Sequence, residues 1–339
     1  MSEQLVLAID GGNSKTDLAL VRADGEVLAL VRGPQSSPHH LGVDGSLKVL
    51  DDLLAQALHE AGLPNGDGPA AHVGKLFLAG VDFPSEEAAM RRAASTRGLA
   101  HNIDVGNDTL AVLRAGTDSG WGVAIVCGAG INCVGVAPDG RQARFPALGW
   151  ITGDWGGGYD VGLAAVSAAA RSEDGRGPKT SLEHAVPEHF GLRTPTELAE
   201  AFHHGEIKER RIIELAPTVV AEAARDETAA AIVGRLAEEV VTMIGVALER
   251  LGLTETPVEV VLGGGLMQSR DDRLSSAVAQ GLHAVAPQAT VKVTSSPPVV
   301  GAALLGLDDL DAGPDAQRRV REELANAFKT METPGRRGR

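Results

Sequence analysis

Three short turns in the sequence combine residues suited to holding phosphate. Each turn follows an apolar run: residues 10–16 follow 5–9, residues 128–130 follow 122–127, and residues 263–265 follow 258–262. Glycine lets backbone amides approach a ligand closely, and the hydroxyls of Ser14 and Thr16 add further donors. The apolar runs predict buried strands. One such turn is a weak signal, whereas three at matching strand ends predict a phosphate-binding site.

Two common nucleotide-binding motifs are absent from these turns. The residues before Lys15 do not form the G-x-x-x-x-G-K pattern of a Walker A loop. The second turn has Cys133 where the third glycine of a dinucleotide fingerprint belongs, and the third turn fails at the same place. The alternative interpretation is an ordinary α/β protein with glycine in its turns.

A carboxylate follows another predicted strand, at residues 102–105. Asn107 and Asp108 come just after it. A positioned carboxylate can orient an attacking hydroxyl and accept its proton, as phosphoryl transfer requires. These residues are also ordinary N-cap material for a following helix, so both interpretations stay open. The histidines are dispersed, and adjacent pairs such as His39 and His40 diverge, so we expect no tightly bound transition metal.

The two halves of the chain repeat one order of elements. Each half reads as strand, glycine turn, strand, Asp-Gly hairpin and strand, followed by alternating helices and strands. This order predicts an α/β fold of two domains, residues 1–115 and 116–307, followed by a C-terminal helix and tail at 308–339. Helical spacing predicts helices at 47–61, 85–96 and 299–307, and one or two helices over 218–251. Because ligands bind where strand ends open into turns, we expect the three turns to line a cleft between the domains.

Composition limits the function classes. The chain has 339 residues, 43% hydrophobic and 22% charged, which is typical of a globular protein of about two domains. Its net charge of −14 repels phosphate backbones, so no nucleic acid partner is expected. No signal peptide or apolar run of membrane-spanning length is visible, and Cys127 and Cys133 form no disulfide framework. A soluble cytoplasmic protein without a membrane partner is expected.

The motifs together resemble one family. Residues 8–16 resemble the first phosphate motif of the N-acetylglucosamine kinase and BadF/BadG/BcrA/BcrD-type ATPase group, which belongs to the sugar kinase, actin and heat-shock ATPase superfamily. Residues 126–133 resemble its second phosphate motif, 260–265 its adenosine motif, and 298–303 the start of its C-terminal helix. The match extends over about residues 5–307. It implies two ribonuclease-H-like domains (the actin-like ATPase fold) flanking a cleft that binds ATP, Mg²⁺ and a sugar.

The resemblance also implies roles for individual residues. Asp10 would hold Mg²⁺ through water, since this ion keeps several of its waters. The backbone of both phosphate motifs would bracket the β- and γ-phosphates, and the third turn would pack against adenosine. The implied nucleotide-binding residues are Gly11, Gly12, Asn13, Ser14, Lys15, Thr16, Gly128, Ala129, Gly130, Gly263, Gly264 and Gly265.

On the sugar side, Asp108 would be the catalytic base. The implied substrate-binding residues are Ser37, His39, Asn107, Asp108, Asp154 and Trp155. The sequence departs from the family pattern at three places: Trp155 replaces a Glu, Pro38 an Asn, and Ala129 a Thr. Trp155 could stack on a sugar face or pack between the domains. The glycines after it read as a hinge or closure loop.

The activity implied is ATP-dependent phosphorylation of an amino sugar. N-acetylglucosamine comes first, at its 6-hydroxyl, and glucosamine or another hexose is the alternative. A different alternative is an ATPase activator of a reductase or dehydratase, a class that holds an iron–sulfur cluster with cysteines at a subunit interface. A sugar-sensing regulator and a binder that transfers no phosphate are the remaining options. Homodimers are common in the group, so a homodimer is an open possibility.

Overall fold

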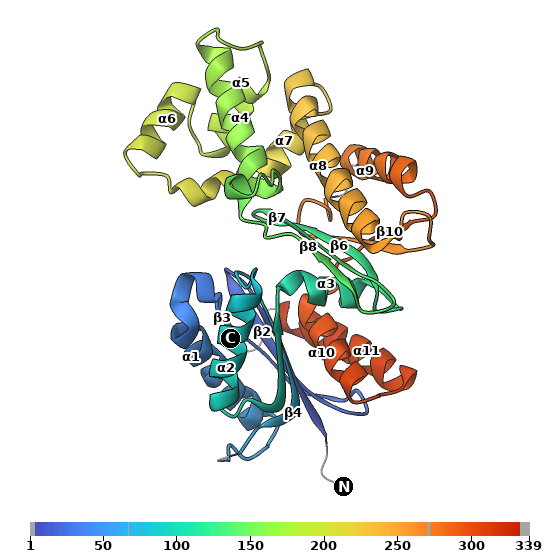
Figure 1. Ribbon diagram of the computed structural model, residues 1–339. Coiled ribbons are helices and arrows are strands. Elements are labelled where there is room, and N and C mark those ends of the chain that lie inside the picture. Colours follow the sequence, from blue (N-terminus) through green and yellow to red (C-terminus); the bar gives the residue numbers. More distant parts are fainter. Residues whose placement is uncertain (1–3, 67, 270–271, 333–339) are drawn as a thin grey trace. The chain divides into compact units, whose positions relative to one another are not determined.

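The chain folds into two units, each built on a five-stranded sheet (Figure 1). The computed structural model describes residues 4–66, 68–269 and 272–332. The first unit comprises Met1–Gly120 together with Ser296–Arg339, and the second comprises Trp121–Ser295. Among the residues described, no helix combines the length and the apolar composition needed to span a membrane.

The sheet of the first unit has the strand order β3-β2-β1-β4-β5. Strands β1, β4 and β5 are parallel, while β2 is antiparallel to both of its neighbours. The strands are β1 (Leu5–Gly11), β2 (Lys15–Arg22), β3 (Val27–Pro34), β4 (Ala71–Leu78) and β5 (Ala100–Gly106). The helices are α1 (Pro38–Glu60), α2 (Pro84–Thr96), α3 (Asp108–Gly116), α10 (Pro298–Asp309) and α11 (Pro314–Glu332).

Alternate residues of β1 enter two separate cores, as the period of two in a strand requires. Leu7 and Ile9 pack with the buried leucines of α1, whereas Val6 and Ala8 pack with α10 and α11. Both faces of the sheet are therefore covered, which explains why the strand is a continuous apolar run.

The second unit repeats the topology of the first. Its sheet order is β10-β9-β6-β7-β8, so in both units the first strand lies between the second and the fourth. The strands are β6 (Gly122–Cys127), β7 (Ile131–Val136), β8 (Gln142–Arg144), β9 (Glu259–Gly263) and β10 (Thr290–Val293). The predicted repeat of strand, turn and hairpin is confirmed.

Helices make up most of the second unit, and one core joins them to the sheet. The α-helices are α4 (Gly157–Glu173), α5 (Leu182–His189), α6 (Pro195–His203), α7 (Ala216–Glu222), α8 (Glu227–Leu251) and α9 (Asp272–Val285). Two 3-10 helices are η1 (Gly149–Ile151) and η2 (Glu209–Leu215). The helical stretch predicted over 218–251 forms two helices, because the Asp226 side chain caps a new start by accepting the Ala229 amide at 2.8 Å.

The domain boundaries differ from those that the sequence indicated. Helices α10 and α11 belong to the first unit, although residues 298–307 were expected in the second domain. The reason is packing: α10 buries Val299, Ala302 and Ala303 against Val6 and Ala8 of β1. Helix α11 extends the same cluster, so residues 314–332 form part of a core and not a separate tail.

Candidate functional site

The predicted acidic residues of the first unit lie at one edge of its sheet. Asp10 is near the end of β1, and Asp108 follows β5. These strands run parallel to β4, with Asp10 opposite Phe77 and Phe77 opposite Gly106. The carboxyl ends of all three strands therefore open on the same side, the usual position of ligand sites in such sheets.

The turn after β1 is shaped by close packing. The Gly12 amide donates to the Lys15 carbonyl at 2.9 Å, which closes the turn. A Cβ atom on Gly11 would lie 2.3 Å from the Leu78 side chain, so any larger residue there would have to displace that side chain. Thr16 is fully buried, and its hydroxyl donates to the Pro34 carbonyl at 2.7 Å. Thr16 thus supports the turn from within, whereas Asn13, Ser14 and Lys15, which follow Gly12, are exposed.

Asp10 lies in an environment short of positive charge. Burial, followed by the charges of Asp108 and Asp17, raises its pKa to about 8, although Lys15 and Arg32 act in the opposite direction. The carboxylate of Asp17 is already bound by Arg32, with two hydrogen bonds of 2.6 and 2.9 Å. A divalent cation would supply the missing positive charge, so the donor set fits Mg²⁺.

This fit also agrees with how Mg²⁺ is usually held. In the described part of the chain, no group of three or more His, Cys, Asp or Glu side chains is arranged to hold a metal. Proteins commonly bind Mg²⁺ through one or two carboxylates together with substrate phosphates and water, and a caged site is not needed.

Asp108 is the first residue of α3 and lies beside its N-cap, Asn107. Burial and then the charge of Asp82 raise the pKa of Asp108 to about 6, while the Thr109 amide acts to lower it. A carboxyl with this pKa is ionised at neutral pH and still accepts a proton readily, as a general base must. Asn107 is 5% exposed and its Oδ1 caps α3, so the capping interpretation applies to Asn107, while the catalytic role of Asp108 stays a prediction.

Asp82 was not among the predicted residues. Its Oδ1 accepts a hydrogen bond of 2.8 Å from Asn107 Nδ2. The sequence did carry a signal, because Asp82 follows the buried strand β4 as Asp108 follows β5. Residues 79–81 separate Asp82 from the end of β4, so its position near the end of a strand is not evident in the sequence.

Ser37 and His39 lie at the start of α1. Ser37 is the N-cap and is fully buried, and its hydroxyl has no hydrogen-bond partner among the residues that the structure describes. His39 is exposed in the first turn, behind Pro38, which suits a helix start. Both side chains approach Gly80, where a Cβ atom would lie 2.7 Å from His39 Cβ and 2.9 Å from Ser37 Oγ.

In the second unit, the turn of residues 128–130 meets the start of α4. The Gly128 carbonyl accepts the Gly158 amide at 2.8 Å, and the Ala129 carbonyl accepts the Tyr159 amide at 2.9 Å. Gly157 has φ +72°, and a Cβ atom there would lie 2.3 Å from the Gly130 oxygen. The glycines that read as a hinge therefore pack against the predicted phosphate turn.

The third glycine turn lies beside the second, because β9 pairs in parallel with β6. Gly263 ends β9. Gly264 has φ +89°, and a Cβ atom there would lie 2.2 Å from the Cys127 carbonyl oxygen. Gly265 is exposed, and open space surrounds the position of its missing Cβ. The structure thus separates a glycine required by packing from one that leaves room for a ligand.

Asp154 and Trp155 precede α4. The Asp154 carboxylate accepts a hydrogen bond from the Thr152 hydroxyl. Trp155 packs against the core of the second unit, and the Arg235 guanidinium lies 4.0 Å from its ring centroid. The indole thus makes a cation–π contact within its own unit, and its predicted roles in sugar stacking or interdomain packing stay predictions.

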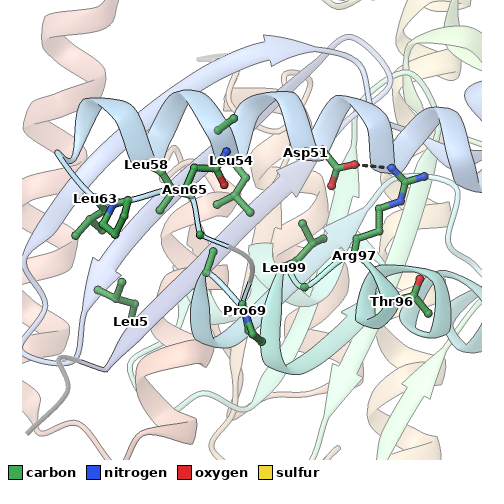
Figure 2. A pocket seen from close by; sticks show the side chains of 16 residues that line it. Leu5, Asp51, Leu54, Leu58, Leu63, Asn65, Pro69, Thr96, Arg97 and Leu99 are labelled. Atoms are coloured by element: carbon green, nitrogen blue, oxygen red, sulfur yellow. Dashed lines mark hydrogen bonds and ion pairs between the residues drawn. The ribbon is translucent and has the colours of Figure 1, made fainter.

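A cavity of about 800 Å³ in the first unit contains none of the predicted site residues (Figure 2). Its lining includes Leu5, at the start of β1, together with Ala70 and Leu99, which precede β4 and β5. It therefore opens at the amino ends of the parallel strands, the opposite edge from Asp10 and Asp108. Its position gives no support for a role in the candidate chemistry.

The paired topology and the glycine turns at strand ends define the class of proteins with the actin-like ATPase fold. A solved structure from Chromobacterium violaceum, provisionally named an N-acetylglucosamine kinase, has a TM-score of 0.68 at 23% identity and covers 90% of this chain and 100% of its own. A glucokinase of the ROK family from Streptomyces griseus, solved with glucose and AMPPNP, has a TM-score of 0.52 at 15% identity. It covers 90% of this chain and 98% of its own.

Sequence comparison defines the family. The model of the BadF/BadG/BcrA/BcrD ATPase family matches residues 7–306, and the chain belongs to that family. The N-acetyl-D-glucosamine kinase of Dictyostelium discoideum is 27% identical over 91% of this chain and 99% of its own length. The N-acetylmuramic acid/N-acetylglucosamine kinase of Clostridium acetobutylicum is 28% identical over 78% of this chain and 86% of its own length.

Proposed function

We propose that this protein is a sugar kinase that transfers the γ-phosphoryl group of ATP to a hydroxyl of an amino sugar. The observation that carries the proposal is Asp108, a partly buried carboxylate whose pKa is raised to about 6 at the sheet edge that also holds Asp10. The two kinases named above support N-acetylglucosamine as the first candidate, phosphorylated at its 6-hydroxyl. Glucosamine and other hexoses follow.

In this proposal Asp108 accepts the proton of the attacking hydroxyl as its oxygen bonds to the γ-phosphorus, and the bond to the β–γ bridging oxygen breaks to release ADP. Asp10 would hold Mg²⁺, which supplies positive charge to the phosphates. The exposed residues 13–15 and the turns of residues 128–130 and 263–265 would contact the nucleotide. Ser37, His39, Asn107 and Asp154 would contact the sugar, and the buried Ser37 hydroxyl is suited to this because it has no hydrogen-bond partner among the described residues.

A coupled ADP-release assay with ATP and Mg²⁺ tests the proposal. The panel comprises N-acetylglucosamine, glucosamine, N-acetylmuramic acid, N-acetylmannosamine and glucose. We expect sugar-dependent release that falls about 10²–10⁴-fold in Asp108→Asn, whereas nucleotide binding persists. The matched control is Asp52→Asn, because Asp52 lies on α1 with 71% of its side chain exposed. Near-normal turnover in Asp108→Asn, or release that no sugar changes, would contradict the proposal.

A further inference from the structure

We propose that Asp82 is a positioning residue of this site: its carboxylate fixes the side chain of Asn107, and through it the start of the helix that presents Asp108. This inference rests on the proposed function and adds a residue to it. The contacts that carry it all lie within the first unit.

The first contact is the hydrogen bond between Asn107 Nδ2 and Asp82 Oδ1, at 2.8 Å. With its nitrogen held there, the Asn107 amide presents Oδ1 to α3, where it accepts the Thr109 amide at 3.0 Å and the Thr109 hydroxyl at 2.5 Å. Asn107 and Thr109 are both buried. An Asn amide can turn over to exchange its oxygen and nitrogen, and the acceptor at Asp82 favours the orientation that caps the helix.

Asp82 is itself held by the helix that follows it. Its backbone amide donates to Glu86 Oε2 at 2.8 Å, and the Phe83 amide donates to the same oxygen at 3.0 Å. Glu86 lies in the first turn of α2, so these bonds fix the connection between β4 and α2. Val81, just before Asp82, is fully buried. The carboxylate therefore has a defined place.

Asp82 also acts on Asp108 through its charge. Two carboxylates lie near Asp108 on neighbouring elements, Asp10 on β1 and Asp82 after β4, and the repulsion from Asp82 contributes to the raised pKa of Asp108. The acidic residues at the end of α10, which packs against α3, are engaged by Arg114 and Lys75. Asp82 thus makes Asp108 a stronger base, because a neighbouring negative charge disfavours its ionised form.

Two substitutions of Asp82 separate positioning from charge. Asp82→Asn keeps an oxygen acceptor for Asn107 and removes the charge, so kcat at pH 8 should stay within about 3-fold of wild type while the acidic limb of the pH–rate profile moves to lower pH. Asp82→Ala removes both, so kcat at pH 8 should fall about 10–100-fold, with KM for the sugar changed less than about 3-fold and the acidic limb moved as in Asp82→Asn. Asp52→Asn should match wild type in all respects.

A structural readout keeps this inference distinct from the proposed function. In ¹³C-carboxyl NMR titrations, with the Asp108 signal assigned by its loss in Asp108→Asn, the midpoint of Asp108 should be lower in Asp82→Asn than in wild type. Exchange of the Thr109 amide should be faster in Asp82→Ala. If wild type transfers no phosphate but these shifts occur, the function is wrong and the Asp82 contacts stand. An unchanged midpoint and unchanged exchange would overturn the inference even in an active kinase.

Discussion

The guanidinium of Arg114 donates hydrogen bonds to both carboxylate oxygens of Asp308, at 2.8 and 3.1 Å. Arg114 lies in the last turn of α3, and Asp308 lies near the end of α10, 194 residues later in the chain. The same helices meet so closely that a Cβ atom on Gly301 would lie 1.8 Å from the Ala111 carbonyl oxygen. The helix that begins with Asp108 is therefore anchored by the C-terminal segment of the chain.

This relationship predicts the effect of Arg114→Met. Arg114 is only 4% exposed, and removing its guanidinium leaves Asp308 and the Thr117 carbonyl without these hydrogen bonds. Because Asp308 is 37% exposed and can be rehydrated, we expect a loss of about 1–3 kcal/mol in the free energy of unfolding. Urea denaturation measures it. The control is Arg318→Met, which removes an exposed ion pair with Asp315 on α11 and should change the free energy of unfolding by less than about 0.5 kcal/mol. Equal losses of stability in both variants would contradict the anchoring role of Arg114.

The raised pKa of Asp108 predicts a pH-dependent change in stability. Its folded-state pKa is about 6 and its ordinary value is 3.8, so the ionised carboxylate destabilises the folded protein most above pH 6, and less as the pH falls toward 4. Asp108→Asn removes this charge. Its melting temperature should exceed that of wild type at pH 8, and the difference should narrow at pH 5.

Calorimetry at the two pH values, with Asp52→Asn as the control, checks this expectation. A difference that does not depend on pH would show that the substitution acts through packing or capping and not through ionisation. Catalysis should show the opposite preference, since sugar-dependent activity should fall below pH 6 as Asp108 becomes protonated.

Local signals were enough to predict most of the fold. Apolar runs ending in glycine identified the first strand of each unit and the position of Asp10, and the predicted strand at 102–105 gave the position of Asp108. The sequence could not show contacts between residues that lie far apart in the chain. Asp82 joins the site through its hydrogen bond with Asn107, 25 residues away, and Trp155 contacts Arg235 from another helix. Periodicity reports that a helix buries one face, but not which sheet covers that face.

The membership of α10 illustrates this limit. Its helical spacing predicted a helix at 299–307, which is confirmed, but its place after the last strand favoured the second domain. Gly301 allows α10 to pack on the first unit, because its missing side chain lets α10 approach Ala111 of α3 closely. The sequence likewise could not show that the Thr16 hydroxyl donates a hydrogen bond to the carbonyl of Pro34 on β3.

Two adjacent glycines offer a test that separates folding from nucleotide binding. Gly264→Ala places a methyl group 2.2 Å from the Cys127 carbonyl oxygen at φ +89°, so we expect it to lower the free energy of unfolding by about 1–3 kcal/mol. Gly265→Ala adds a methyl group in open space and should leave stability within about 0.5 kcal/mol.

If adenosine packs on this turn as proposed, Gly265→Ala should instead raise KM for ATP with little change in KM for the sugar. Denaturation curves and initial rates on the same preparations check both expectations. A normal KM for ATP in Gly265→Ala would place the adenosine elsewhere.

The two cysteines provide a test against the ATPase-activator alternative. Cys127 and Cys133 are buried in the core of the second unit, and burial raises the pKa of both thiols, that of Cys127 to about 12. Because the thiolate is both the nucleophile and the cluster ligand, we expect neither thiol to react with Ellman's reagent in the native protein, and two per chain to react in guanidinium chloride. Ser95→Cys, on the exposed side of α2, is the positive control and should react at once.

Anaerobic incubation with iron and sulfide should give no cluster, since a cluster would have to displace the packing around β6 and β7. A stoichiometric iron–sulfur absorption band, lost when Cys127 is replaced by Ala, would contradict this expectation and favour the activator.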